Sequence, residues 1–397
     1  MNDHLKSLAY FGSMPYFSNL IRNDCRNIAD WKSFKKLFNK LFQNGWYTNH
    51  GPLAQELEKR LESLLKVKHV ICVTNETIGL SLAMKALGLQ KKVIVPALSF
   101  AGTVQSLIWS NLEPVFCDVD IHTHMINESQ IKSAMNNNVT GVIGVHMWGN
   151  SCDNSILKKI SNDYDIKLFY DATHAFGCTF NQKFIGNLGE LEVFSFHEST
   201  IINSFGGGAI STNNDKLAAY IRNSRSSYGR GKLEPVSLTG NGRFSEAQAA
   251  LAILSLDNYE QRIKQNLQKE KLYKSLLNIP GISFINHPED EKTNYQYVAI
   301  QIDEEKFGLS KKELAVLLKA ENIIVNKSPF FPLVYLTHPA NVHQQYISTK
   351  FENAISISNS LIQLPSSEAI SFDTIKKICE IIIFIYENST QIKKKLR

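Results

Sequence analysis

Three short segments of the chain combine polar side chains with turns, and each is a candidate for ligand chemistry. The first runs from Tyr170 to Ala175 and places Asp171 directly after an apolar run that starts at Lys167. An acidic residue at the carboxyl end of a buried strand lies where open α/β sheets bind their ligands. Asp171 is therefore a candidate partner for a cationic ring nitrogen, a metal ion or a ribose. The alternative is that Asp171 only caps the following helix.

The second segment runs from Ser195 to Thr200 and is followed by glycines at 206–208. A hydroxyl at a strand end and the N–H groups of a glycine-rich turn can together bind a phosphate. Equally, the glycines can serve only as a flexible turn before another strand. No Gly-Lys-Ser or Gly-Lys-Thr follows them, so this segment is not a P-loop.

The third segment, from Val73 to Thr77, lies between an apolar run and a helical pattern. The backbone N–H groups of Glu76 and Thr77 would then point out of a helix N-terminus, which attracts anions. The alternative is that Thr77 is an ordinary N-cap residue. Taken singly, none of the three segments decides a function.

Short apolar runs alternate with helical patterns from about residue 68 onward. Such runs are typical of buried strands in a parallel sheet that is covered on both faces. The sequence therefore predicts an α/β fold with a mostly parallel sheet sandwiched by helices. The expected strands are 69–73, 93–96, 114–119, 140–145, 167–170 and 192–196.

The pattern changes near residue 261, and this change suggests three parts. We expect an N-terminal helical and loop segment at 1–44 that packs on the core, and a large α/β domain at 45–260. A smaller C-terminal α+β domain is expected at 261–397, because strands and helices are mixed there. Its expected elements are helices at 264–277, 311–321 and 372–386 and strands at 297–302 and 323–325.

The composition narrows the class of protein. The 397 residues include 43 Lys and Arg against 37 Asp and Glu, and the one dense basic run is the tail at 393–397. A nucleic-acid partner is therefore not expected, and the lack of a long apolar stretch predicts no membrane span. The six cysteines form no Cys-x-x-Cys pair, so no structural metal site is expected. We expect a cytoplasmic protein with reduced cysteines.

The order and spacing of several motifs resemble the DegT/DnrJ/EryC1/StrS family, the nucleotide-sugar aminotransferases of fold type I that use pyridoxal phosphate. The resemblance runs nearly from end to end. It is carried by residues 46–52 (Trp-Tyr-Thr-Asn-His-Gly-Pro), 95–100 (Val-Pro-Ala-Leu-Ser-Phe), 114–120 (Pro-Val-Phe-Cys-Asp-Val-Asp), 145–149 (Val-His-Met-Trp-Gly), 240–246 (Gly-Asn-Gly-Arg-Phe-Ser-Glu), 331–333 (Phe-Pro-Leu) and 363–365 (Gln-Leu-Pro). The last two match the Pro-Leu and Leu-Pro marks near the family's C-terminus.

The resemblance implies roles for residues around a cofactor ring. Asp171 matches the carboxylate that pairs with the pyridine nitrogen and keeps it protonated, so that the ring accepts electrons. His174 matches the position beside the ring hydroxyl, and Phe100 matches the aromatic residue that stacks on the ring face.

The resemblance also implies a phosphate site and a shared interface. Ser195, Thr77 and the amide of Glu76 match the groups that bind the cofactor phosphate. Asn241 matches a phosphate ligand that the partner subunit supplies, which implies a homodimer with shared sites. Family members bind nucleotide-linked 4-keto or 3-keto sugars across that interface.

Three positions depart from the family pattern. Thr200 occupies the place of the lysine that forms the Schiff base with the cofactor, and a hydroxyl cannot form an imine. Glu76 replaces a glycine in the phosphate-binding turn, where a carboxylate repels a phosphate unless it is paired. Phe205 begins the segment in which the family has Gly-Glu-Gly-Gly, so that glutamate is absent.

These departures leave three functions open. The first is the family's own activity, transfer of an amino group to a keto-deoxy sugar nucleotide in surface polysaccharide or glycan biosynthesis. The second is a lysine-free, pyridoxamine phosphate-dependent sugar dehydratase. The third is a non-catalytic protein that binds a nucleotide sugar or a partner. Because of Thr200, any pyridoxal or pyridoxamine phosphate is expected to bind non-covalently.

Overall fold

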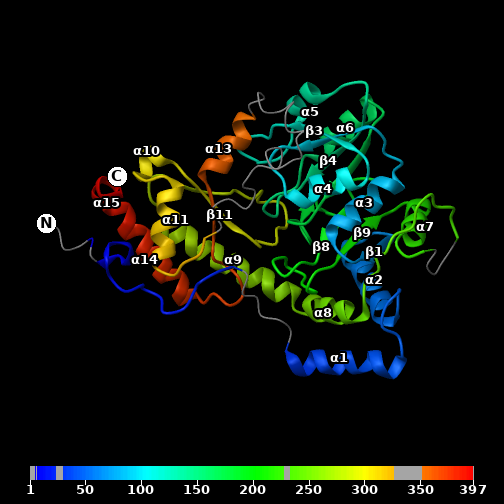
Figure 1. The fold of residues 1–397 in the computed structure, drawn as a ribbon, viewed down its shortest axis with the longest axis horizontal. Coiled ribbons are helices and arrows are strands. Elements are labelled where there is room, and N and C mark those ends of the chain that lie inside the picture. Colours follow the sequence, from blue (N-terminus) through cyan, green and yellow to red (C-terminus); the bar gives the residue numbers. More distant parts are fainter. Residues whose placement is uncertain (1–4, 6, 24–29, 228–232, 326–350, 397) are drawn as a thin grey trace.

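A computed structural model describes residues 5, 7–23, 30–227, 233–325 and 351–396 of the chain, and two sheets organise it (Figure 1). The larger sheet has seven strands in the order β1-β9-β8-β5-β4-β2-β3. All neighbouring pairs are parallel except those of β9, which is antiparallel to both β1 and β8. The strands are β1 (His69–Val73), β2 (Lys92–Pro96), β3 (Glu113–Cys117), β4 (Val139–Val145), β5 (Lys167–Asp171), β8 (Glu192–Ser195) and β9 (Gly208–Thr212).

Consecutive residues of these strands are buried, and this pattern requires cover on both faces of the sheet. Every residue of β8 and β9 is buried, as are four of the five residues of β5. The expected mostly parallel α/β domain is therefore confirmed. The helices around this sheet are α1 (Trp31–Asn44), α2 (Pro52–Leu65), α3 (Glu76–Ala86), α4 (Ala101–Trp109), α5 (Glu128–Ala134), α6 (Asn154–Asp163), α7 (Asp215–Ser224), α8 (Glu246–Asp257) and α9 (Tyr259–Leu276), with a short β6 (Thr179–Phe180) and β7 (Lys183–Phe184) hairpin.

The second sheet is small and wholly antiparallel, in the order β10-β11-β12. Its strands are β10 (Ile282–Phe284), β11 (Val298–Ile302) and β12 (Leu361–Leu364), and its helices are α10 (Glu304–Phe307), α11 (Lys311–Ala320), α13 (Glu352–Ser360), α14 (Phe372–Glu387) and α15 (Ser389–Leu396). The expected strand at 323–325 is reduced to one isolated bridge, between Ile323 and Ile21. The motif at 331–333 lies outside the described residues. No helix in the described part of the chain is long and apolar enough to cross a membrane.

Two separate hydrophobic cores underlie the two sheets. The N-terminal residues are divided between them: Leu5 and Leu8 belong to the core of the small sheet, whereas Leu41 of α1 belongs to the core of the large sheet. The N-terminal segment thus packs on both cores. The exact domain boundaries expected from the sequence stay a prediction.

A distant carboxylate caps α2, because the sequence at its start cannot do so. Gly51 is the N-cap residue and has no side chain, and Pro52 has no N–H to offer. Glu246, the first residue of α8, accepts hydrogen bonds from the N–H groups of Leu53 at 2.8 Å and Ala54 at 2.9 Å. A Cβ at Gly51 would lie 2.6 Å from the Glu246 carboxyl carbon, so only glycine leaves room for this cap.

We expect Glu246→Ala to lower the free energy of unfolding by about 2 kcal/mol, because it leaves two buried N–H groups without an acceptor. Urea unfolding monitored by circular dichroism measures this loss. Glu56→Ala is the matched control, because Glu56 is an exposed residue of α2. This control should change the stability by less than about 0.5 kcal/mol. Equal losses in the two variants would show that the cap does not stabilise α2.

Candidate functional site

The carboxyl ends of β5 and β8 bring together the first two candidate segments. Asp171 ends β5 and Ser195 ends β8, and the two strands are parallel neighbours with Asp171 beside Val193. The start of α3 lies against the same edge: a Cβ at Gly208, which pairs with Ser195, would lie 3.1 Å from the Glu76 backbone nitrogen. Gly208 therefore allows the third segment to reach the strand ends.

The Asp171 carboxylate is buried and held on both oxygens. Its Oδ2 accepts a hydrogen bond from Thr103 Oγ1 at 2.7 Å, and its Oδ1 accepts one from the Thr173 backbone N–H at 3.1 Å. Thr103 is fully buried in α4, and the sequence analysis did not identify it. Its place three residues after Phe100, on the core side of a helix, was the available signal. These bonds fix the direction of the carboxylate, which is what a ligand partner requires.

Glu76 is the unexpected member of this group, because its side chain turns into the protein. Only 7% of Glu76 is exposed, and its Oε1 has no hydrogen-bond partner among the described residues. Burial, the neighbouring charge of Asp171 and a hydrogen bond with it raise the pKa of Glu76 well above its usual value, against a smaller effect of Thr77. The site therefore contains a carboxylic acid beside a carboxylate.

His174 lies three residues beyond Asp171 and is held as a neutral ring. Burial lowers the pKa of His174 to about 4, although the charge of Asp171 opposes this shift. The Nδ1 atom accepts a hydrogen bond from the Trp148 N–H at 3.5 Å, and the ring centroid lies 4.4 Å from that of Tyr297. Because Nδ1 accepts a hydrogen bond, the neutral ring carries its proton on Nε2, which suits the role expected beside a ring hydroxyl.

Phe100 is placed where an aromatic side chain can cover a flat ligand. It is the N-cap residue of α4, and 56% of it is exposed. A Cβ at Gly102 would lie 2.8 Å from Thr77 Oγ1 and 3.1 Å from the Phe100 ring. Gly102 thus allows the starts of α3 and α4 to approach each other, and it brings Thr77 and Phe100 to the same part of the site.

Thr200 is buried and its hydroxyl is used within its own loop. The Oγ1 atom lies within hydrogen-bond distance of the backbone carbonyls of Ser195 at 3.1 Å, His197 at 2.8 Å and Ile202 at 2.7 Å. The neighbouring Ile201 is held by Gln296, which accepts its N–H at 2.6 Å, and by Arg262, which donates to its carbonyl at 3.0 Å. Thr200 thus closes a rigid turn and presents no nucleophile.

Two of the residues named from the sequence stand apart from this cluster. Asn241 is exposed, and its Oδ1 accepts a hydrogen bond from Arg243 at 2.9 Å. Phe205 is 54% exposed and has a left-handed backbone, with φ of 57°, at the start of the glycine run. None of the described contacts joins Asn241 to Asp171, Glu76 or Ser195. Its role in the partner's site stays a prediction.

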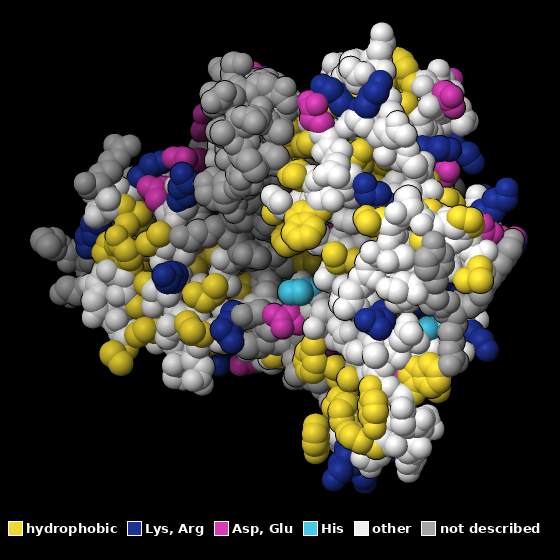
Figure 2. Space-filling view, turned by 45° about the vertical axis from the view of Figure 1, so that its right-hand side comes forward, with side chains coloured by type: hydrophobic (Ala, Val, Ile, Leu, Met, Phe, Trp, Pro, Cys, Tyr) yellow, Lys and Arg dark blue, Asp and Glu magenta, His cyan; other side chains and the backbone are white. Residues whose placement is uncertain are grey.

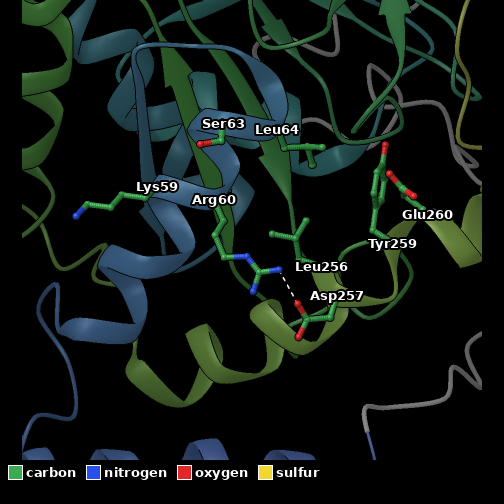
Figure 3. Close-up of a pocket in the computed structure, with 8 residues that line it drawn as sticks. All are labelled: Lys59, Arg60, Ser63, Leu64, Leu256, Asp257, Tyr259 and Glu260. Atoms are coloured by element: carbon green, nitrogen blue, oxygen red, sulfur yellow. Dashed lines mark hydrogen bonds and ion pairs between the residues drawn. The ribbon is translucent and has the colours of Figure 1, made fainter.

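A surface pocket lies elsewhere, between α2 and the junction of α8 and α9 (Figure 3). An ion pair between Arg60 and Asp257 crosses it. It is lined by Lys59, Arg60, Ser63, Leu64, Leu256, Asp257, Tyr259 and Glu260, none of which belongs to the cluster at the strand ends. Among the described residues, no group of three or more His, Cys, Asp or Glu residues could hold a metal ion. The strand-end cluster therefore remains the candidate site.

Comparison with known proteins identifies the family. A family model, that of the DegT/DnrJ/EryC1/StrS aminotransferases, matches residues 29–383. The chain belongs to this family. It is 30% identical over 362 residues to dTDP-4-amino-4,6-dideoxy-D-glucose transaminase from Shigella dysenteriae, covering 90% of this chain and 96% of the relative. GDP-perosamine synthase from Vibrio cholerae is 28% identical over 358 residues, covering 88% and 95%.

Solved structures agree with this assignment and confirm the fold. DesI, solved in the presence of its TDP-sugar product, superposes with a TM-score of 0.92 at 30% identity over 99% of this chain and 100% of DesI. The PMP form of the sugar aminotransferase Spr1654 from Streptococcus pneumoniae superposes with a TM-score of 0.82 at 19% identity, covering 92% and 99%. The fold type I architecture expected from the sequence is therefore confirmed, and the family is one of aminotransferases that use pyridoxal or pyridoxamine phosphate.

The residues of this chain fit such a cofactor only in part. Asp171 suits a protonated ring nitrogen, and Ser195 with the start of α3 suits a phosphate. Thr200 provides no amine, and the buried Glu76 carboxyl lies beside Asp171. The arrangement therefore does not fit the cofactor in its covalently attached form.

The raised pKa of Glu76 predicts a pH-dependent stability. Below about pH 4.5, the usual pKa of the group, Glu76 is protonated in both folded and unfolded chains. As the pH rises from there through the raised pKa of the folded state, the unfolded chain loses the proton first, so folding becomes less favourable. As the pH rises, the unsubstituted protein (the parent) should lose up to about 1.4 kcal/mol of unfolding free energy per pH unit relative to the Glu76→Gln variant.

Urea unfolding of both proteins between about pH 5 and 8 tests this expectation. Glu128→Gln is a matched control, because Glu128 is also the first residue of a helix. A hydrogen bond and charge from Lys132 lower the pKa of Glu128, so its contribution changes only below the tested range. A constant difference between the parent and Glu76→Gln across the range would show that Glu76 is already ionised in the folded protein.

Proposed function

We propose that this chain is a nucleotide-sugar-binding member of the aminotransferase family that serves surface polysaccharide or glycan synthesis without a covalent cofactor link. The sugar class is supported by the relatives, which include transaminases and synthases named for dTDP-linked and GDP-linked amino sugars and a spore coat polysaccharide biosynthesis protein. The absence of a covalent cofactor link rests on one observation, which is that the Thr200 hydroxyl hydrogen-bonds to backbone carbonyls. A keto-deoxy sugar nucleotide is the proposed ligand.

The side chains at the strand ends have separate tasks in this proposal. Thr103 fixes Asp171, so that its negative charge faces the ligand side of the sheet. Ser195 and the N–H groups at the start of α3 present donors to an anionic group. His174, neutral because of its burial, supplies a hydrogen-bond partner beside them.

Amino transfer by a lysine is the family activity that Thr200 removes from this chain. The lysine amine forms the covalent link and moves the proton of the substrate, and a hydroxyl does neither near neutral pH. A pyridoxamine-dependent dehydratase needs a base at the same position. Thr200 is no base, since it has no titratable group near neutral pH and its hydroxyl bonds carbonyl oxygens. The geometry thus favours a binding protein over a dehydratase.

We further propose a cytoplasmic homodimer with shared sites. The observation that supports dimerisation is an exposed aromatic row on α1 and the segment after it. Trp31 is 70% exposed, Phe42 61% and Tyr47 52%, and this row extends through Phe34 and Phe38 by ring contacts. Hydrophobic side chains gather at the lower end of the molecule, over α1 (Figure 2). Exposed aromatic patches of this kind are typical of protein interfaces.

The first expected result concerns ligands. A thermal shift is expected with a nucleotide-linked sugar, because a ligand that binds only the folded state raises its stability. Incubation with pyridoxal phosphate and borohydride should leave no lysine adduct detectable by mass spectrometry, because position 200 carries no amine. A trapped lysine in this chain would contradict the proposal.

The second expected result concerns assembly. Light scattering after gel filtration should give about twice the mass of one 44.9 kDa chain. The double variant Trp31→Ser and Phe42→Ser should shift the protein toward the monomer, because both exposed rings lie in the proposed interface. Trp109→Ser is the matched control, because Trp109 is 78% exposed at the end of α4. A parent that is monomeric at all concentrations would contradict the dimer.

A further inference from the structure

We propose that Glu76 closes the cofactor position from within, because its side chain reaches Asp171 and occupies the place that a pyridine ring nitrogen would need. This inference rests on the proposed function only in identifying the strand ends as the family's cofactor site. The predicted consequence is that this chain excludes pyridoxal and pyridoxamine phosphate even as non-covalent ligands. It would then hold its nucleotide sugar in a cofactor-free site.

The backbone of Glu76 is fixed, so the direction of its side chain is also restricted. Asn75 caps α3 by accepting the Ile78 N–H at 2.9 Å, and the Thr74 N–H donates to the Gly242 carbonyl at 2.9 Å. Gly208 packs against the Glu76 nitrogen from the other side. The side chain leaves this tight turn into the interior, where only 7% of the residue remains exposed.

The carboxylate of Asp171 has two acceptor positions left, one on each oxygen. Thr103 and the Thr173 N–H already occupy one position on each oxygen. The protonated carboxyl of Glu76 takes one of the remaining positions, because burial and the charge of Asp171 keep its proton on. A protonated pyridine nitrogen makes the same kind of bond, so the two groups compete for Asp171.

Loss of the Glu76 proton does not reopen the site to the cofactor. An ionised Glu76 would place a second negative charge beside Asp171, on the first residue of α3, where a cofactor phosphate would bind. The repulsion between two anions in a buried site is large. In its protonated form Glu76 blocks the ring nitrogen, and in its ionised form it repels the phosphate. Both protonation states therefore exclude the cofactor.

The test compares the parent with Glu76→Gly, which restores the family's residue, and with Glu76→Gln, which keeps the volume and removes the charge. Pyridoxamine phosphate is the probe, and its binding is measured by isothermal titration calorimetry and by thermal shift. We expect no binding by the parent or by Glu76→Gln. Glu76→Gly should bind, with a midpoint that rises by about 2 °C or more at saturating probe.

Glu128→Gly is the matched control, because it also removes a glutamate from the first position of a helix with an asparagine cap, where the side chain is 42% exposed. It should not gain binding. Glu76→Gly is expected to fold, because the side chain it removes carries a buried oxygen without a partner. Glu76→Ala is the second variant in case the glycine weakens α3, since alanine also empties the position.

Two results would overturn the inference: binding of pyridoxamine phosphate by the parent, or no binding by folded Glu76→Gly and Glu76→Ala. If Glu76→Gln bound pyridoxamine phosphate as strongly as Glu76→Gly does, the claim that residue 76 competes with the ring nitrogen for Asp171 would also be wrong. A parallel titration with a nucleotide sugar separates this inference from the proposed function. Failure of the parent to bind the sugar counts against that function, whereas the difference between the variants still decides the role of Glu76.

The same inference predicts the outcome of restoring the lysine. Thr200→Lys alone should give little borohydride-trapped adduct with pyridoxal phosphate, because Glu76 still fills the site. Thr200→Lys combined with Glu76→Gly should give an adduct at position 200 that is at least about tenfold more abundant, the ratio that 1.4 kcal/mol of relieved exclusion corresponds to. Circular dichroism confirms that both variants fold. Equal trapping in the two would overturn the inference.

Discussion

A buried carboxylate at the end of β5 is the group on which the candidate site depends. Taking the charge of Asp171 out of water is costly unless hydrogen bonds compensate it, and α4 and the turn after β5 supply them through Thr103 and the Thr173 N–H. The strand ends, the start of α3 and the start of α4 therefore converge on one charge. The glycines at 208 and 102 make this possible, because a Cβ at either would press on the neighbouring segment.

Two further residues shape the surroundings of this charge. Thr200 carries no amine, and its hydroxyl lies within hydrogen-bond distance of three carbonyls in the turn between β8 and the glycine run. Glu76 places an acid next to Asp171 and raises its own pKa in doing so. The fold is retained along nearly the whole chain, as the superposition with DesI shows. The family's scaffold thus persists around the strand-end site.

Much of the architecture was predictable, because buried strands and helices have different periods in the sequence. The runs at 69–73, 93–96 and 167–170 became β1, β2 and β5 almost residue for residue. The antiparallel β9 was not predicted, since strand direction leaves no mark in a short apolar run. The expected strand at 323–325 became a single bridge, because its pairing with Ile21 depends on a segment far away in the chain.

The sequence by itself determined the family and the α/β class, because motif order and the spacing of apolar residues are local properties. It also placed Asp171 and Ser195 at strand ends, and parallel strands end on the same edge of a sheet. Only the tertiary structure decided that Thr103 holds Asp171, that Glu246 caps α2 and that Glu76 turns inward to meet Asp171. These contacts join residues far apart in the chain, so their energies depend on burial and direction, which no linear pattern contains.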